Sequence, residues 1–373
     1  MRDINANIKL RSQKSSFDIW LLLSTLLLIF VGLVAIYDAS VVSAFRDFGD
    51  KFYFIKNQLL WALLGLFSLC VFSYFNYRKL IKTSNYFLGL CTFLLILLFI
   101  PYIGREILGA RRWISVGGLT FQPSEFAKLA VIFYSTFIIS KFEKFKMRFS
   151  DTFLVYFLPI GIVTGLVIMQ PDLGTALVFF AVTIIIYFIG NAPIWHFFIA
   201  LPVIILTAIV SLMTHPYRLE RIKAFIDPKY DPQGASYQIN QIIIALVSGG
   251  LFGVGLGASR SKFEFIPEVH NDAIFAVIVE ETGFIGALLL LLLFIFLINR
   301  CLTIIKSAPD FSGKILATGL TGLIASQTLL NLAAIVALVP LTGIPLPFIS
   351  YGGSSLFVNL TAIGILLNIK RQS

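Results

Sequence analysis

Long apolar segments alternate with short polar connections over nearly the whole chain. Apolar runs of about 17–25 residues are long enough to cross a bilayer as helices. Such runs lie at 17–39, 53–75, 84–102, 122–140, 152–170, 174–190, 196–213, 273–299, 315–338 and 351–369. The pattern therefore predicts an all-α, polytopic membrane protein with about ten transmembrane helices.

The composition agrees with this fold class. Of the 373 residues, 58% are hydrophobic and only 13% are charged, and the mean hydropathy is +0.91. Soluble domains of this size do not have such a composition. Cys70, Cys91 and Cys301 lie in or beside apolar segments, so we expect neither a disulfide framework nor a metal site. We expect one integral-membrane domain, residues 1–373. The net charge of +10 suits anionic lipid, and we expect no nucleic-acid partner.

Lysine and arginine positions predict the orientation of the spans. With ten spans, both termini and three of the more basic connections fall on one face, which the positive-inside rule makes cytoplasmic. The residues on that face are Arg2, Lys9, Arg11, Lys14, Arg78, Lys79, Lys82, Lys141, Lys144, Lys146, Arg148, Arg300, Lys306, Lys314, Lys370 and Arg371. We therefore predict a protein of the cytoplasmic membrane with cytoplasmic termini and a cytoplasmic tail at 1–16.

Two unusual segments, 103–121 and 214–272, then fall on the extracytoplasmic face. The second is a long loop between the seventh and eighth spans, and long loops are usually functional or disordered. It includes a predicted short helix, Tyr237–Leu246, and the Gly-rich stretch Ser248–Gly257, whose glycines permit tight turns. A surface flap is the alternative interpretation.

Acidic residues gather where this loop meets the next apolar run. Glu264, Glu268, His270 and Asp272 precede it, and Glu280 and Glu281 lie inside it, where carboxylates are costly. On a helix, Glu280 lies on a face near that of Asp272, about 12 Å along the axis, whereas Glu281 points toward another helix. Asp272 has two interpretations, a desolvated general base or an N-terminal helix cap.

Other residues could bind an anionic lipid substrate. Arg111 and Arg112 suit phosphate, and Trp113 suits the bilayer interface or a sugar face, although anchoring to headgroups explains all three equally simply. Gln122 to Glu125 read as a helix start, and Lys128 lies three residues beyond Glu125, so the two can pair, either for function or as a structural ion pair.

Three further stretches have both a structural and a functional interpretation. Arg218 and Arg221 would face a headgroup, either bulk lipid or substrate. Asp172, between Pro171 and Gly174, is typical of a turn. The prolines of Pro340–Ser355 exclude a regular helix, so this segment either lines a cavity or forms a structural hairpin.

Five motifs in order carry a family resemblance: GARRWISVGGLTFQPSEFAKLAV, QPDLGTA, DPQGASYQINQ with SGGLFGVGLG, IPEVHNDAIFAVIVEETG and TGIPLPFISYGGSS. Together they resemble the SEDS family, to which FtsW and RodA belong, over essentially the whole chain. The segment GLGASRSKFEFIPEVHND is more similar to FtsW-type sequences. Asn271, Ala273 and Thr282 stand where Thr, Phe and Leu are common in the family.

The resemblance implies a peptidoglycan glycosyltransferase that polymerises lipid II at the outer face of the cytoplasmic membrane, in cell division or elongation. Asp272 matches the catalytic carboxylate of the family. The expected substrate-binding residues are Arg111, Arg112, Trp113, Gln122, Ser124, Glu125, Lys128, Arg218, Arg221, Glu268, His270 and Ser350. No cofactor is required by the sequence, although Mg or Mn would suit the departing diphosphate.

The resemblance also implies partners: lipid II, the growing lipid-linked strand, a class B penicillin-binding transpeptidase, other division or elongation proteins, and membrane lipid. Two other functions stay open. A lipid II flippase would explain the intramembrane pair Glu125–Lys128, but the unusual residues gather on one face of the membrane. A scaffold for wall-building proteins would need no catalytic carboxylate.

Overall fold

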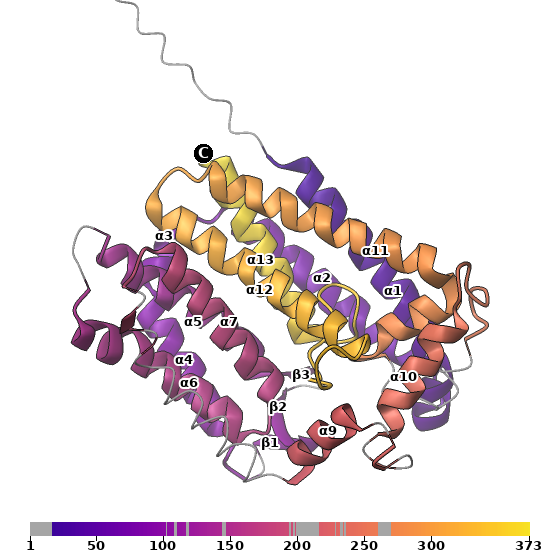
Figure 1. The fold of residues 1–373 in the computed structure, drawn as a ribbon. Coiled ribbons are helices and arrows are strands. Elements are labelled where there is room, and N and C mark those ends of the chain that lie inside the picture. Colours follow the sequence, from indigo (N-terminus) through magenta and orange to yellow (C-terminus); the bar gives the residue numbers. More distant parts are fainter. Residues whose placement is uncertain are drawn as a thin grey trace, which may run out of the picture.

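A computed structural model shows a bundle of long helices with one small sheet at its lower end (Figure 1). It describes residues 17–101, 103–107, 110–116, 119–143, 147–193, 195–196, 198, 216–227, 229–231, 234, 236–259 and 270–373. The helices are α1 (Ile19–Phe48), α2 (Tyr53–Tyr74), α3 (Tyr77–Lys82), α4 (Ser84–Leu97), α5 (Pro123–Lys141), the π-helical segment η1 (Asp151–Phe157) with α6 (Leu158–Met169), α7 (Leu173–Ile189), α9 (Pro216–Ile226), α10 (Tyr237–Ser248), α11 (Ile274–Lys306), α12 (Phe311–Ile335) and α13 (Gly353–Arg371).

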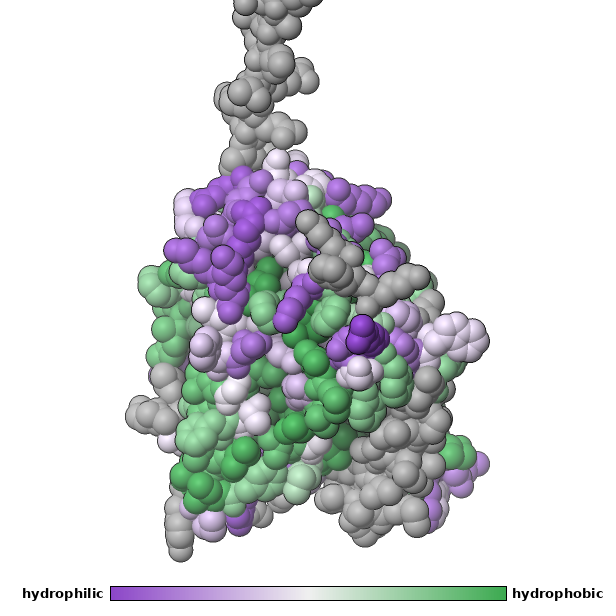
Figure 2. Space-filling view, turned by 90° about the vertical axis from the view of Figure 1, so that its left-hand side faces the viewer, coloured by the Kyte–Doolittle hydropathy of each residue, from purple (hydrophilic) through white to green (hydrophobic). Residues whose placement is uncertain are grey.

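These helices confirm a multi-pass membrane protein. Within the described residues, six helices are long and apolar enough to cross a membrane, namely α1, α2, η1 with α6, α11, α12 and α13. Every predicted span coincides with a helix except 196–213, which lies almost entirely outside the described residues. Figure 2 shows a broad hydrophobic band on one face of the molecule, with hydrophilic residues gathered at one end.

The bundle has two chemically different ends. At the end where α1 begins and α13 finishes, which we call the terminal end, Arg300 pairs with Asp18 and Arg78 pairs with Asp310, both at 2.7 Å. Arg78 also donates a hydrogen bond to Gln372. The sheet lies at the opposite end, which we call the sheet end (Figure 1).

Helix α13 forms the buried centre of the bundle, and small residues let it approach α2 closely. A Cβ at Gly65 would lie 2.5 Å from the Leu360 side chain, and one at Gly364 would lie 2.6 Å from the Leu69 carbonyl oxygen. The hydroxyls of Ser68 and Thr361 are hydrogen-bonded at 2.6 Å. Small residues with interhelical hydrogen bonds are the usual means of packing helices within a membrane.

The all-α prediction misses a three-stranded antiparallel sheet of order β1-β2-β3. Its strands are β1 (Gly104–Ile107), β2 (Ala110–Val116) and β3 (Leu119–Phe121), inside the segment 103–121 that the sequence singled out as unusual. Ile114 pairs with Gly104 on one side and Phe121 on the other. Windows sized for membrane helices cannot detect strands this short. Only Gln122 separates the end of the sheet from Pro123, so the sheet fixes the entry of α5.

Helix α11 is broken at Gly283, where φ is +68°. The Gly-rich stretch lies against the break, because Gly249 and Gly253 leave no room for a Cβ against the Val279 and Glu281 carbonyls. Backbone hydrogen bonds join the two segments: Val254 to Glu280, Gly255 to Glu281, Phe284 to Gly250 and Ile285 to Leu251. The predicted tight turns are thus confirmed. They supply hydrogen-bond partners to the backbone N–H and carbonyl groups that the break in α11 leaves unpaired.

The exposed side of α10 and of the following turn is strongly apolar. Its residues, which we call the α10 apolar surface, are Ile243, Ile244, Val247, Leu251, Phe252, Val254 and Leu256. The sequence from Gly234 to Ser259 contains no charged residue. This surface adjoins exposed apolar residues of α11 such as Phe284 and Leu289. We therefore expect this part of the predicted loop to lie in the membrane rather than in water.

Cysteine labelling tests this placement. In a protein whose native cysteines are replaced by Ala, Val247→Cys and Phe252→Cys should react slowly with a membrane-impermeant maleimide in proteoliposomes, because the reactive thiolate needs water. Lys229→Cys, at an exposed position of the same predicted loop, is the matched control and should react quickly. Equal rates at all three positions would show that the α10 apolar surface faces water.

Candidate functional site

Asp272 lies at the sheet end, in the turn before α11. The N-cap residue of α11 is Ala273, so Asp272 lies one residue before the N-cap position. The Asp272 side chain is half-buried. A Cβ built at Gly343 would lie 3.9 Å from its Oδ2 atom, which places the carboxylate beside the Pro-rich segment. That segment is non-helical from 339 to 352, as predicted.

His270 packs as an aromatic side chain beside Asp272. Its ring centroid lies 4.3 Å from that of Phe54 and 5.5 Å from that of Tyr351. Its carbonyl accepts a 2.9 Å hydrogen bond from the Tyr351 N–H, which joins this turn to the Pro-rich segment. Burial lowers the pKa of His270 to about 4, against an opposing effect of the Asp47 carboxylate. At neutral pH the ring is therefore uncharged, and its predicted substrate role stays a prediction.

Ser350 stabilises the bend of the Pro-rich segment. Its hydroxyl accepts a 2.9 Å hydrogen bond from the Leu346 N–H, and its own N–H donates to the Leu346 carbonyl. Gln58 of α2 adds a second anchor, because its amide donates to the Ser350 carbonyl and accepts from the Gly352 N–H. Sequence reasoning placed Ser350 among substrate ligands and overlooked Gln58, which follows Lys56 and Asn57 near the start of α2.

A second polar cluster lies on the other side of the Pro-rich segment. The Gln122 side chain donates to Ser124 Oγ at 3.0 Å and to Asp172 Oδ2 at 3.1 Å, and the Gln122 N–H donates to Ser354 Oγ. Asp172 also caps α7 by accepting from the Thr175 N–H. Gly174, which follows Asp172, lies against the carbonyl of Thr342. The turn interpretation of Asp172 is confirmed, and its second oxygen ties that turn to α5.

The two adjacent arginines of β2 have different environments. Arg112 is half-buried and donates through Nε to the Gln170 carbonyl at 2.9 Å and through a terminal nitrogen to the Pro171 carbonyl. Its guanidinium therefore secures the turn between α6 and α7. Arg111 is exposed, and Trp113 is half-buried. Of the two predicted phosphate ligands, Arg111 is the one with an exposed side chain.

Glu125 and Lys128 form the predicted ion pair in the first turns of α5. Lys128 Nζ lies 2.5 Å from Glu125 Oε1, and the two side chains are only 4% and 2% exposed. Glu125 Oε2 is buried without a hydrogen-bond partner. A buried pair of this kind depends on both members, because either charge alone would be uncompensated in an apolar setting.

Glu280 and Glu281 both accept hydrogen bonds from Ser259, and Glu281 also faces a second helix, as its helical position predicts. Glu280 accepts a 2.5 Å hydrogen bond from the Ser259 hydroxyl, and Glu281 accepts one from the Ser259 N–H. Glu281 is also hydrogen-bonded to the Asp38 carboxyl of α1, the other helix that it faces. These acids anchor the Gly-rich stretch, and neither bonds to Asp272 in the described contacts.

The remaining predicted ligands are placed only in part. Arg221 of α9 is exposed and donates a 3.2 Å hydrogen bond to the Leu341 carbonyl of the Pro-rich segment. The Arg218 side chain and the whole of Glu268 lie outside the described residues. The structure thus brings Asp272, His270 and Arg221 against the Pro-rich segment, to which Ser350 belongs. Gln122 and Ser124 reach this segment through Ser354.

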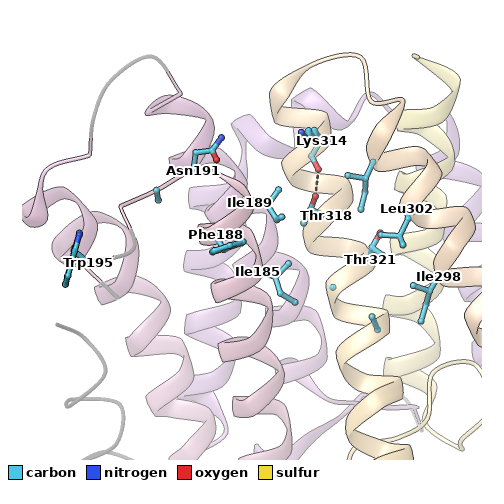
Figure 3. A pocket seen from close by; sticks show the side chains of 14 residues that line it. Ile185, Phe188, Ile189, Asn191, Trp195, Ile298, Leu302, Lys314, Thr318 and Thr321 are labelled. Atoms are coloured by element: carbon cyan, nitrogen blue, oxygen red, sulfur yellow. Dashed lines mark hydrogen bonds between the residues drawn. The ribbon is translucent and has the colours of Figure 1, made fainter. Parts of the chain in front are cut away.

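A groove of about 950 Å³ lies elsewhere, between α7, α11 and α12 toward the terminal end (Figure 3). It contains none of the predicted site residues. Its walls are mostly apolar, with Asn191 and Lys314 near its mouth, and such a surface is suited to lipid chains. The lining residues are Ile185, Phe188, Ile189, Asn191, Ala192, Trp195, Ile298, Leu302, Ile305, Lys314, Thr318, Thr321, Gly322 and Ala325.

Comparison with known proteins agrees with this geometry. The family model described as "Cell cycle protein" (FtsW, RodA, SpoVE) matches residues 19–373. The chain is 43% identical to stage V sporulation protein E of Bacillus subtilis, covering 97% of this chain and 99% of that protein. It is 40% identical to the probable peptidoglycan glycosyltransferase FtsW of Trichlorobacter lovleyi, covering 95% and 93% of the two chains.

Solved structures show the same fold. A chain of a peptidoglycan synthase complex, in which polymerization and crosslinking are coordinated, superposes with a TM-score of 0.77 at 28% identity, covering 96% of this chain and 98% of that one. The rod shape determining protein RodA of Thermus thermophilus gives 0.69 at 25% identity, covering 96% and 97%.

Fold and site together define a multi-pass membrane protein of the cell-wall synthesis machinery. The chain belongs to the FtsW/RodA/SpoVE family.

The buried ion pair gives a stability prediction. Lys128→Met should lower the free energy of unfolding by about 3–5 kcal/mol, because Glu125 then stays buried without a partner charge. The double variant Glu125→Gln/Lys128→Met should recover most of that loss. Thermal unfolding of the detergent-purified protein measures both. A double variant as unstable as the single one would contradict the pairing.

His270 gives a pH prediction. Its pKa of about 4 lies below the ordinary value near 6.5, so the unfolded state binds more protons between these values. Stability should therefore be unaffected above pH 6.5 and fall by roughly 3 kcal/mol as pH decreases to 4. His270→Phe keeps the aromatic packing and should reduce this loss. The check is the melting temperature of both proteins across this range, and identical pH profiles would refute the prediction.

Proposed function

We propose that this protein is a peptidoglycan glycosyltransferase that polymerises lipid II, with Asp272 as its general base. The observation that carries the proposal is the match, over nearly the whole chain, to relatives named probable peptidoglycan glycosyltransferase FtsW. The position of Asp272 supports it, because the carboxylate is half-buried, precedes the helix cap, and lies beside a non-helical segment at one end of the bundle.

In this reaction an acceptor sugar hydroxyl attacks the anomeric carbon of a lipid-linked donor. A hydroxyl is a weak nucleophile, so Asp272 accepts its proton while the new glycosidic bond forms. The bond between the anomeric carbon and the diphosphate breaks with inversion, and the polyprenyl diphosphate leaves with the bonding electrons. A half-buried carboxylate at the edge of the apolar bundle can meet a sugar while the polyprenyl chain stays in lipid.

Positive charge is needed where the diphosphate departs. Arg111 and Arg221 are exposed at the sheet end and are our candidates for this role, together with Trp113 for the sugar. Arg112 and Lys128 are engaged by backbone carbonyls and by Glu125. The described residues contain no cluster of three or more His, Cys, Asp or Glu suited to a metal. Mg²⁺ is often held by one or two carboxylates together with substrate phosphates, so a cation would depend on the bound diphosphate.

We propose ten spans with both termini in the cytoplasm. Helix α7 finishes at the terminal end, where Asn191 and Lys314 share the groove, whereas α9 lies at the sheet end through Arg221 and Leu341. The predicted span 196–213, which lies almost entirely outside the described residues, would connect these two ends. Arg78, Lys141, Arg300, Lys306 and Arg371 belong to the terminal end, which the positive-inside rule assigns to the cytoplasm. The sheet end and Asp272 then face the outer side of the inner membrane.

The structural relative solved as a peptidoglycan synthase complex suggests the partners. We propose that this chain likewise works beside a penicillin-binding transpeptidase that crosslinks the strands it makes. The resemblance to both FtsW and RodA supports a role in division or elongation without selecting one.

Purified protein given labelled lipid II should form glycan strands. Asp272→Asn removes the base with little change of shape, and the rate should fall by about 10²–10⁴-fold. Asp227→Asn, an exposed acid in the same predicted loop, is the control and should polymerise at the wild-type rate. Gel analysis of the products, with and without the transpeptidase, gives the rates. A fully active Asp272→Asn protein would overturn the assignment.

A further inference from the structure

Asn331 connects the two segments that meet at Asp272. This residue lies in the last two turns of α12 and is only 2% exposed. Its side-chain amide donates one hydrogen bond to the Asp272 carbonyl and one to the Ile344 carbonyl, both at 2.8 Å. One amide group therefore joins the turn before α11 to the Pro-rich segment.

Both carbonyls need such a partner. Asp272 precedes the first residue of α11, and Ile344 belongs to a stretch that is non-helical through 352. Neither region has a continuous helical ladder to satisfy its backbone groups. Away from water, an unpaired carbonyl is costly. Asn331 satisfies both, and it does so from a rigid helix.

The orientation of the Asn331 amide has a cost of its own. Its Oδ1 atom is buried without a hydrogen-bond partner. Leu in its place would remove that cost but would leave the Asp272 and Ile344 carbonyls without their amide donors. The amide is held so that its donors face the Asp272 backbone. Its second acceptor, Ile344, directly follows Gly343, and a Cβ at Gly343 would lie 3.9 Å from Asp272 Oδ2.

We propose that Asn331 is a positioning residue for Asp272, which holds the carboxylate at a fixed place relative to the Pro-rich segment. The inference rests on the proposed role of Asp272 as general base. Asn331 does not touch substrate and acts only through the Asp272 backbone. A misplacement of a catalytic group by about 1 Å can cost on the order of 100-fold in rate.

The test compares two buried asparagines of membrane helices. Asn331→Leu removes both hydrogen bonds to the site. Asn359→Leu is the matched control, because Asn359 is also buried with an unpaired Oδ1 but donates only to Ser355 in its own helix α13. We expect Asn331→Leu to lower kcat for lipid II polymerisation by about 10–100-fold with KM unchanged. Asn359→Leu should keep wild-type kcat and KM.

Two further measurements distinguish a positioning role of Asn331 from a purely structural one. In the Asp272→Asn background, Asn331→Leu should cause no additional loss of rate, because groups that act as one unit are non-additive. If Asn331→Leu fails to fold, Asn331→Asp keeps the shape but offers at most one donor, and its kcat should also fall at unchanged KM.

The outcomes separate this inference from the function on which it rests. Loss of activity in Asp272→Asn together with wild-type kcat in both folded Asn331 variants would overturn the positioning role and leave the proposed function intact. An additive loss in the double variant would also overturn it. An inactive wild-type protein, or a fully active Asp272→Asn protein, would instead reject the proposed function.

Discussion

The need to satisfy backbone hydrogen bonds away from water governs this structure. Helices do so internally, so wherever the chain leaves the helix inside the bundle, another group must supply the partner. The Pro-rich segment receives partners from Gln58, Asn331 and Arg221, which come from three different helices. The break in α11 receives its partners from the Gly-rich stretch. The candidate carboxylate, Asp272, lies in the turn before α11 and beside the Pro-rich segment.

The same constraint separates the polar residues into two groups. Gln58, Ser350, Asn331 and Arg112 bind backbone and hold the irregular segments in place. Asp272 and the exposed Arg111 present charge at the surface of that arrangement. The chemistry therefore depends on a few charged side chains, and the placement of those side chains depends on the many polar residues that bind backbone. Replacing one of the backbone ligands should affect the site without any contact to substrate.

Much of the fold could be predicted from the sequence, because apolar length and periodicity determine membrane helices directly. The pair Glu125–Lys128 and the contact of Glu281 with a second helix also followed from helical spacing alone. The sheet was missed because its strands are too short for the windows used. The packing of His270 against Phe54 of α2 and Tyr351 of the Pro-rich segment could not be predicted, because a sequence does not show which distant rings come together.

Asn331 and Gln58 were missed for a different reason. Each amide resembles the other polar residues of its helix, and its importance lies in its hydrogen bonds to carbonyls far away in the chain. The sequence signal that could have pointed to them is the cost of burying an amide in a membrane helix. That cost shows that a partner must exist but does not identify it.

The crossing of Gly253 and Gly283 has a consequence for how the protein reaches its final form. Each glycine stands where the backbone of the other segment leaves no space for a Cβ. The open groups of α11 find partners only in the docked stretch, and that stretch finds part of its own in the opened helix. Neither conformation is favourable by itself inside a membrane. Unwinding of the helix and docking of the loop therefore form one cooperative step of assembly, which follows insertion of the spans.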